Sequence, residues 1–148
     1  MPERHLSHED ISDLRALARV IIPPSATYGV PGADDDLIFS DICRSLDRDH
    51  DDVCRALADL RALSGGAFAD LDAERRKQVA NAFREQGGNA LAALVRVVLL
   101  CYYRDDRVMT SLGQEPRAPF PKGHVLEQGD LSLLDPVRAR PPIWRRVK

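Results

Sequence analysis

One stretch, residues 89–103, constrains the fold of this chain most, since thirteen of its fifteen residues (NALAALVRVVLLCYY) are apolar. A surface helix carries one apolar stripe, whereas a helix that is apolar nearly all round must be covered on several sides. A membrane span needs about 20 apolar residues, and Arg96 interrupts this shorter run. We therefore predict an all-α protein, a compact bundle of about five helices around a central helix at 89–103, with no membrane insertion.

The prolines delimit the helical body, because none occurs between Pro31 and Pro116 and proline breaks helix interiors. Apolar spacing and turn residues place the boundaries of the elements. We expect Ser7, Asp72 and Asn89 to be N-caps and Gly65 to end a helix in the left-handed conformation. The predicted helices run from Ser7 or His8 to Ile22, from Asp34–Asp36 to Arg48, from Asp51 to Leu63, from Asp72 to Gly87 and over 89–103, with a short turn at 107–112.

Helical spacing also predicts which side chains face the core. These are Ile11, Leu14, Leu17, Ala18 and Ile21; Leu37, Ile38, Ile42 and Leu46; Val53, Cys54, Leu57 and Leu60; and a thin stripe of Val79, Ala80 and Phe83. The three cysteines, Cys43, Cys54 and Cys101, lie among apolar residues at irregular spacing. We expect small buried side chains there rather than a disulfide framework or a zinc site.

The composition changes after residue 113. Residues 114–148 hold six of the ten prolines and a net charge of +3, whereas residues 1–113 carry −5. The segment does not have the pattern of a helix or strand, yet it holds too many apolar side chains for a solvated tail. We predict a helical domain at 1–113 and an extended, proline-rich arm at 114–148 that lies along the body or a partner.

Candidate chemistry is sparse. Asp49, His50 and Asp51 could bind a divalent cation, but they fall between two predicted helices, where acidic residues serve as caps. His5, His8 and His124 have no neighbouring ligand or nucleophile in the sequence. No dinucleotide fingerprint, phosphate-binding loop or basic recognition helix is present, so we expect no nucleic-acid partner. The interpretation that these residues favour is a non-catalytic chain with no cofactor or metal of its own.

The residues at the end of the predicted central helix and in the C-terminal arm favour partner binding instead. Trp and Arg are enriched at interface hot spots, and the last eleven residues, RARPPIWRRVK, combine both. The alternative, which we favour less, is that this basic end folds back on the acidic body. The candidate partner-binding residues are Tyr102, Tyr103, Arg107, Met109, Pro119, Phe120, Pro121, Trp144, Arg145 and Arg146.

Two motifs resemble a known family. One is LRALARVIIPP at 14–24, followed by Pro31-Gly32-Ala33, and the other is CYYRDDRV at 101–108. With the long helical middle between them, they resemble the gluconate 2-dehydrogenase subunit 3 family, the small subunits of FAD-dependent alcohol and sugar dehydrogenases. The resemblance covers about residues 10–113, and 111–136 look like the tail of one branch of that family.

The resemblance implies a small subunit that binds and stabilises a large subunit of the glucose–methanol–choline type, which carries the FAD and the chemistry. Many members of the family carry a twin-arginine export signal. The N-terminus here, MPERHLSHED, has no such signal and no apolar segment of a secretory leader. We therefore expect a cytoplasmic complex, or a periplasmic one if a signal-bearing partner carries the chain. The alternatives from the residues alone are a small metal-binding protein or enzyme using Asp49, His50 and Asp51, and a stand-alone helical regulator.

Overall fold

The computed structural model describes residues 6–118, 123 and 127–141. Contacts divide the chain into two units, Met1–Pro116 and Arg117–Lys148. The described residues form helices and turns without a β-strand, and they include one isolated antiparallel bridge between Ser25 and Val30. The predicted all-α class is confirmed.

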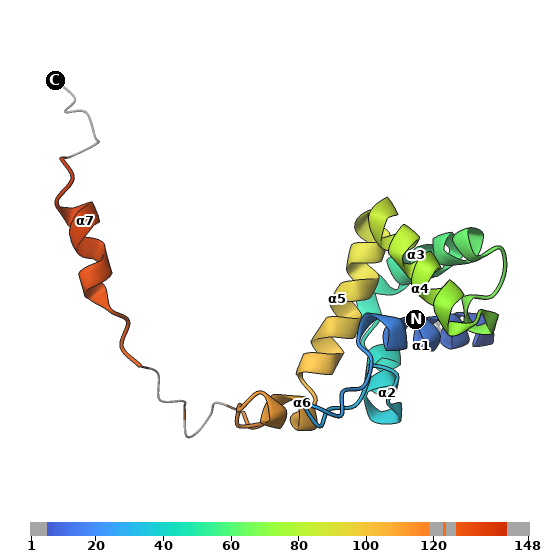
Figure 1. The fold of residues 1–148 in the computed structure, drawn as a ribbon, viewed down its shortest axis with the longest axis horizontal. Helices are drawn as coiled ribbons and strands as arrows, with labels where there is room; N and C mark the ends of the chain where they lie inside the picture. Colours follow the sequence, from blue (N-terminus) through green and yellow to red (C-terminus); the bar gives the residue numbers. More distant parts are fainter. Residues whose placement is uncertain (1–5, 119–122, 124–126, 142–148) are drawn as a thin grey trace. The chain divides into compact units, whose positions relative to one another are not determined.

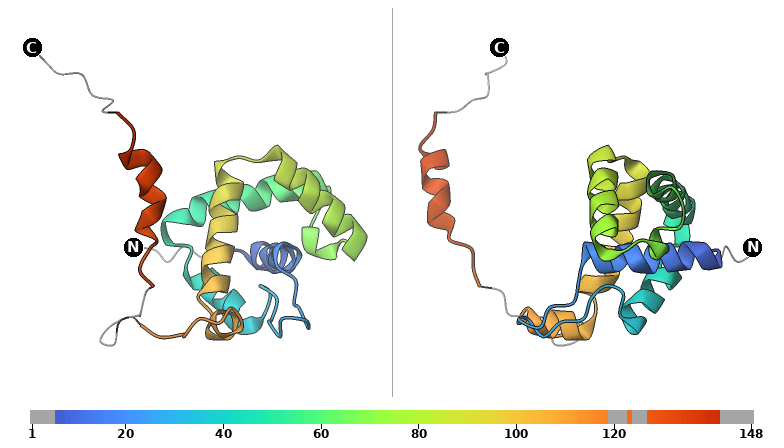
Figure 2. Two further views of the ribbon diagram at one scale, coloured as in Figure 1. Left: turned by 60° about the vertical axis from the view of Figure 1, so that its left-hand side comes forward. Right: turned by 45° about the vertical axis from the view of Figure 1, so that its right-hand side comes forward.

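The first unit contains six α-helices, which cross one another at steep angles rather than running in parallel (Figures 1 and 2). Helix α5 packs mainly against α3 and α2, while α1 and α4 pack against each other and against α3. Two short 3₁₀ helices, at Asp47–Asp49 and Phe68–Asp70, connect them. The α-helices are α1 (His8–Ile21), α2 (Asp36–Arg44), α3 (His50–Ser64), α4 (Ala73–Gln86), α5 (Asn89–Tyr103) and α6 (Asp106–Ser111).

Most of the predicted caps are present. Ser7 and Asp10 form a reciprocal capping box at the start of α1, and the Asp72 side chain accepts a hydrogen bond from the Arg75 amide at the start of α4. Gly65 ends α3 with φ of 73°, a conformation that costs glycine little. The prediction that Asn89 caps α5 is wrong, because Gly88 holds the N-cap position and Asn89 is the first helical residue.

The core lies where α1, α2, α3 and α5 meet. Phe68, from the 3₁₀ helix before α4, is fully buried there. Each such side chain contributes roughly 1.5–3 kcal/mol when it leaves water. Helix α5 supplies the most, with six buried residues: Ala93, Leu94, Val97, Val98, Cys101 and Tyr102.

Several predicted inward-facing residues do not face inward. Helix α2 ends at Arg44 rather than Arg48, because Asp47 adopts a left-handed φ of 34°. Within α2, Ile38 and Ile42 are buried as predicted and Phe39 is buried beside them, while Leu37 is 69% exposed. Ile11 is 38% exposed, and its place on the buried face of α1 is taken by a polar residue that the pattern of apolar side chains excluded, Asp13.

Asp13 is fully buried and makes the central polar contact of the body. Its carboxylate accepts hydrogen bonds from Arg61 Nε (2.7 Å) and from the Ala69 backbone amide (2.9 Å). Arg61 also donates to Asp10 (2.7 Å). This network joins α1, α3 and the 3₁₀ helix at Phe68–Asp70, so a buried carboxylate is tolerated because each of its oxygens has a donor.

The expectation that α5 is covered on several sides is wrong for its C-terminal half. Leu99, Leu100 and Tyr103 are 36%, 60% and 53% exposed. With 3.6 residues per turn they lie within an arc of about 100°, opposite the six buried residues. Helix α5 is accordingly central in the sequence pattern but lies at one side of its unit (Figure 2).

The second unit contains a short helical element, which contradicts the prediction that residues 114–148 lack helix. A 3₁₀ helix at Leu131–Leu134 runs into α7 (Asp135–Arg138). Asp130 caps it by accepting from the Ser132 amide (3.0 Å), and Pro136 lies in the first turn of α7, where the missing amide hydrogen costs nothing. Leu131, Leu133, Leu134 and Val137 are all exposed. In the described part of the chain, no helix combines the length and apolar character that a bilayer span requires.

Candidate partner-binding surface

The last turn of α5 contains two adjacent tyrosines, one buried and one exposed. Tyr102 is buried, and its hydroxyl donates a hydrogen bond to the Pro31 carbonyl (3.1 Å). Tyr103 points to the surface and meets the Tyr102 ring edge-on, with centroids 5.2 Å apart and planes at 89°. Burial raises the pKa of the Tyr102 hydroxyl, and Tyr103 and Asp105 add to that shift. The edge-on ring contact with buried Tyr102 supports the exposed ring of Tyr103.

An apolar surface continues from Tyr103 in both directions. Leu99 and Leu100 lie one turn back along α5, and Leu112, at the end of α6, is 57% exposed. We call these four residues the α5–α6 face. Single exposed leucines are common on soluble proteins, whereas contiguous exposed apolar side chains mark contact sites. Sequence reasoning missed both leucines and Leu112 because it treated α5 as buried all round.

Beside this face lies a groove of about 360 Å³ between α5, α6 and the loop that joins α1 to α2. We call it the tyrosine groove. Tyr28, which is 74% exposed, lies on that loop, and the loop passes α6 in Figure 1 and in the right-hand view of Figure 2. Sequence reasoning missed Tyr28 as well, since one tyrosine in a turn-rich loop carries no pattern. The groove is lined by Ile22, Pro23, Ser25, Tyr28, Val30, Tyr102, Tyr103, Val108, Ser111 and Leu112.

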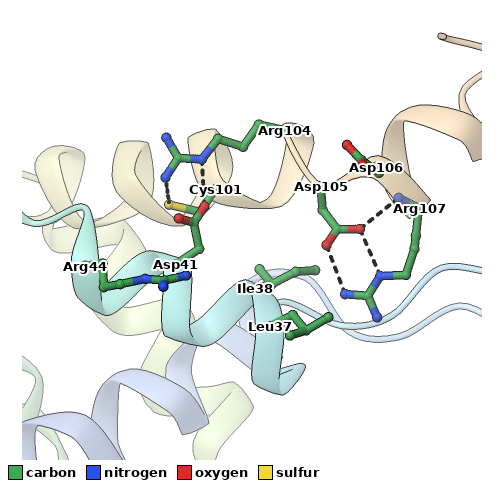
Figure 3. Close-up of a pocket in the computed structure, with 9 residues that line it drawn as sticks. All are labelled: Leu37, Ile38, Asp41, Arg44, Cys101, Arg104, Asp105, Asp106 and Arg107. Carbon is green, nitrogen blue, oxygen red and sulfur yellow. Dashed lines mark hydrogen bonds and ion pairs between the residues drawn. The ribbon is translucent and has the colours of Figure 1, made fainter. Parts of the chain in front are cut away.

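A second hollow, of about 410 Å³, opens between α2, α5 and α6 (Figure 3). It is lined by paired charges. Arg104 Nε donates to Asp41 (2.6 Å), and Arg107 donates to Asp105 (2.9 and 3.0 Å) and to Asp35 (2.7 and 3.2 Å). We call these five residues the arginine–aspartate cluster. Its hydrogen bonds fasten the start of α2 to the α5–α6 junction.

The electrostatics of this cluster follow from the pairing. Hydrogen bonds from Arg107 hold the pKa values of Asp35 and Asp105 below the usual range, and the bond from Arg104 does the same for Asp41. The same contacts raise the pKa of Arg107. The guanidinium groups of Arg104 and Arg107 are thus each matched by carboxylates.

The cysteines do not provide a reactive group. Cys101 is buried beside Arg104, whose guanidinium lies 3.5 Å from its sulfur. Burial raises the pKa values of Cys43, Cys54 and Cys101, and a thiol, unlike a thiolate, is a poor nucleophile. The prediction of small buried side chains is confirmed for Cys101, while Cys43 and Cys54 are half-buried.

The acidic junction at 47–52 serves as a link between helices. Asp49 accepts a hydrogen bond from Arg96 of α5, and His50 Nδ1 lies 3.3 Å from the Asp51 carboxylate and 3.8 Å from the Cys54 sulfur. Among the described residues, no group of three or more His, Cys, Asp or Glu side chains is placed to hold a metal ion.

The remaining candidate residues divide between two locations. Met109 is half-buried on α6, next to Val108 in the core. Pro119, Phe120, Pro121, Trp144, Arg145 and Arg146 lie outside the described residues, as do His5 and His124. The structure thus brings Tyr103 and Arg107 to neighbouring parts of one surface, with Tyr102 beneath it.

What this surface binds has to be inferred from its own chemistry. No protein-family model, curated protein or solved structure matches the chain.

Proposed function

We propose that this chain is a non-catalytic small subunit that binds and stabilises the large subunit of an FAD-dependent sugar or alcohol dehydrogenase. The large subunit, of the glucose–methanol–choline type, would carry the FAD and the reaction. The family is proposed from the resemblance at residues 14–33 and 101–108. The complex would be cytoplasmic, or periplasmic if the partner carries the export signal.

The observation that carries the binding role is the α5–α6 face. Leu99, Leu100, Tyr103 and Leu112 are exposed together on two consecutive elements, whereas the exposed apolar residues of α1, α2 and α3 (Ile11, Leu37 and Leu63) occur singly. Burial of apolar area is the main favourable term in most protein associations, so a partner that covers these side chains gains free energy. The partner's own exposed apolar surface would be covered in the same step, which is how a small subunit stabilises a larger one.

The position of the face in the sequence supports the same role. Leu99 and Leu100 directly precede CYYRDDRV, one of the two motifs of the resemblance, Tyr103 lies within it, and Leu112 follows it by four residues. The charges next to it are already paired with one another: Asp41 with Arg104, and Asp35 and Asp105 with Arg107. A partner can therefore approach without leaving an unpaired buried charge, which is costly.

The test is affinity purification of the full chain from cells that also express its candidate large subunit. We expect a stoichiometric second protein with flavin absorbance, and higher dehydrogenase activity than the large subunit shows alone. Leu100→Gln should weaken the complex at least tenfold, whereas Leu63→Gln, on α3, should not. A purified chain that brings down no flavoprotein, or equal binding by both variants, would contradict the proposal.

A further inference from the structure

Contacts within the chain hold both walls of the tyrosine groove. On one side, the loop that carries Tyr28 is closed by two backbone hydrogen bonds between Ser25 and Val30, of 3.0 and 3.1 Å. The Tyr28 amide also approaches the Ser25 hydroxyl at 3.4 Å. On the other side, Tyr103 is held against buried Tyr102. The backbone that carries Tyr28 and the ring of Tyr103 are thus held before any ligand arrives, which lowers the entropic cost of binding.

The chemistry of the groove is apolar with hydroxyl donors. None of its described lining residues is charged. The floor is aliphatic, with Ile22, Val30 and Val108, and the rim carries the hydroxyls of Tyr28 and Tyr103. Within the part of the chain that the structure describes, neither hydroxyl has a hydrogen-bond partner. A matching ligand therefore presents apolar rings to the walls and free acceptors to the rim.

A helix does not meet both requirements, because its carbonyls are used within the helix. A polyproline II segment does. It has three residues per turn, no internal hydrogen bonds and exposed carbonyls, and its proline rings stack on aromatic side chains in grooves of this kind. We propose, relying on the proposed function for the identity of the partner, that the tyrosine groove binds an extended, proline-rich segment of the large subunit.

Binding of this ligand to the groove also has a low entropic cost. Proline loses little backbone freedom when it becomes ordered, and the Tyr28 loop and Tyr103 are already ordered. The face formed by Leu99 and Leu100 would take the bulk of the partner, while the groove beside it would select one segment. The two surfaces share Tyr103 and Leu112, so a single partner can cover both.

The test uses the isolated full chain and a decaproline peptide, so it does not require the large subunit. Titration calorimetry and amide NMR shifts should show saturable binding, with the shifted amides confined to residues 22–30 and 102–113. Tyr28→Phe removes one hydroxyl donor and should weaken binding by about threefold to tenfold. Tyr103→Ala should weaken it by more than tenfold, and the control Leu63→Ala should have no effect.

The same titration distinguishes the other occupants. Equal binding of a peptide with alanine in place of proline, or shifts outside the groove, would overturn the proposal. So would tighter binding of a leucine-rich helical peptide, of a second copy of the chain, or of a peptide copied from residues 114–123. Failure here leaves the purification of the flavoprotein complex as a separate measurement, and failure of that complex leaves the peptide result intact.

Discussion

At the α1–α3 end of the helical body, the Asp13 carboxylate is fully buried and receives donors from Arg61 and Ala69. At the α5–α6 end, Asp35 and Arg107 form an equally short pair, but their side chains are 27% and 42% exposed. The same two chemical groups therefore have different roles. The first pair is essential to packing, because water cannot replace its partners, while the second steadies a surface that stays accessible.

The apolar residues show the same difference. Near Asp13, the side chains of Leu14, Leu57 and Leu60 are buried. At the other end, Leu99, Leu100 and Tyr103 are exposed although their helix supplies more buried residues than any other described helix. One end of the body thus has the features of a stable interior, and the other those of a contact surface. Five substitutions test this distinction.

The largest effect is expected for Asp13→Ala. The substitution leaves the Arg61 guanidinium half-buried without one of its carboxylates and removes the acceptor for the Ala69 amide. Breaking one side of a buried pair costs about 3–5 kcal/mol of unfolding free energy, which urea denaturation measures. The control is Asp36→Ala. Asp36 pairs with Arg15 and its side chain is 88% exposed, so the loss of this pair should cost less than about 1 kcal/mol of unfolding free energy. Similar losses of unfolding free energy for both variants would contradict the difference between the Asp13 network and the exposed ion pairs.

The next effect separates the two tyrosines. Tyr102→Ala empties a buried site and removes the bond to the Pro31 carbonyl, so it should cost about 3–5 kcal/mol. Tyr103→Ala loses only the edge-on ring contact and should cost no more than about 1.5 kcal/mol. Thermal and urea unfolding of both variants give the comparison. Equal destabilisation would return Tyr103 to the core and weaken the case for a contact surface there.

A smaller stability effect with a larger binding effect is expected for Leu100→Gln. Glutamine is a good helix former and the site is 60% exposed, so the unfolding free energy should change by no more than about 0.5 kcal/mol. Binding of the large subunit should fall at least tenfold, as measured by surface plasmon resonance with Leu63→Gln as the control. A change in stability without a change in binding would show that Leu100 is part of the fold and not of the contact surface.

The sequence predicted the regular features of this fold and missed the exceptions that tertiary contacts create. The helices of the first unit, apart from the end of α2, the Ser7 and Asp72 caps and the Gly65 end follow from local rules and were correct. Buried Asp13 was missed because hydropathy alone does not show that it pairs with Arg61, which is 48 residues away in the sequence. Exposed Leu100 was missed because hydropathy alone does not show that no described helix covers the outer side of α5. Gly88 replaced Asn89 as the cap because it adopts φ of 105°, which glycine takes readily.

The candidate site was predicted only in part, because some of its residues come together only through tertiary contacts. Tyr103 and Arg107 were identified from their place at the end of the central helix, whereas Tyr28 was missed, since it reaches the groove only through the fold of the α1–α2 loop. Helix α7 was missed because prolines suggested an extended chain. Pro136, however, lies in the first turn of that helix, the position at which a helix tolerates proline.

The smallest effect is expected for Arg107→Ala and depends on pH. Because Arg107 holds the pKa values of Asp35 and Asp105 below their usual range, its contribution is present while both carboxylates are ionised. It is lost as pH falls through these lowered pKa values, below the ordinary value of 3.8. At pH 7 and low salt, the substitution should reduce the unfolding free energy by about 0.2–1 kcal/mol, as for other exposed pairs. The difference between the wild type and the variant should shrink as the pH is lowered below 3.8, in urea titrations at each pH. A difference that stays constant with pH would mean that the Arg107 side chain acts through packing rather than charge, and the arginine–aspartate cluster would then resemble the Asp13 network more closely than its exposure suggests.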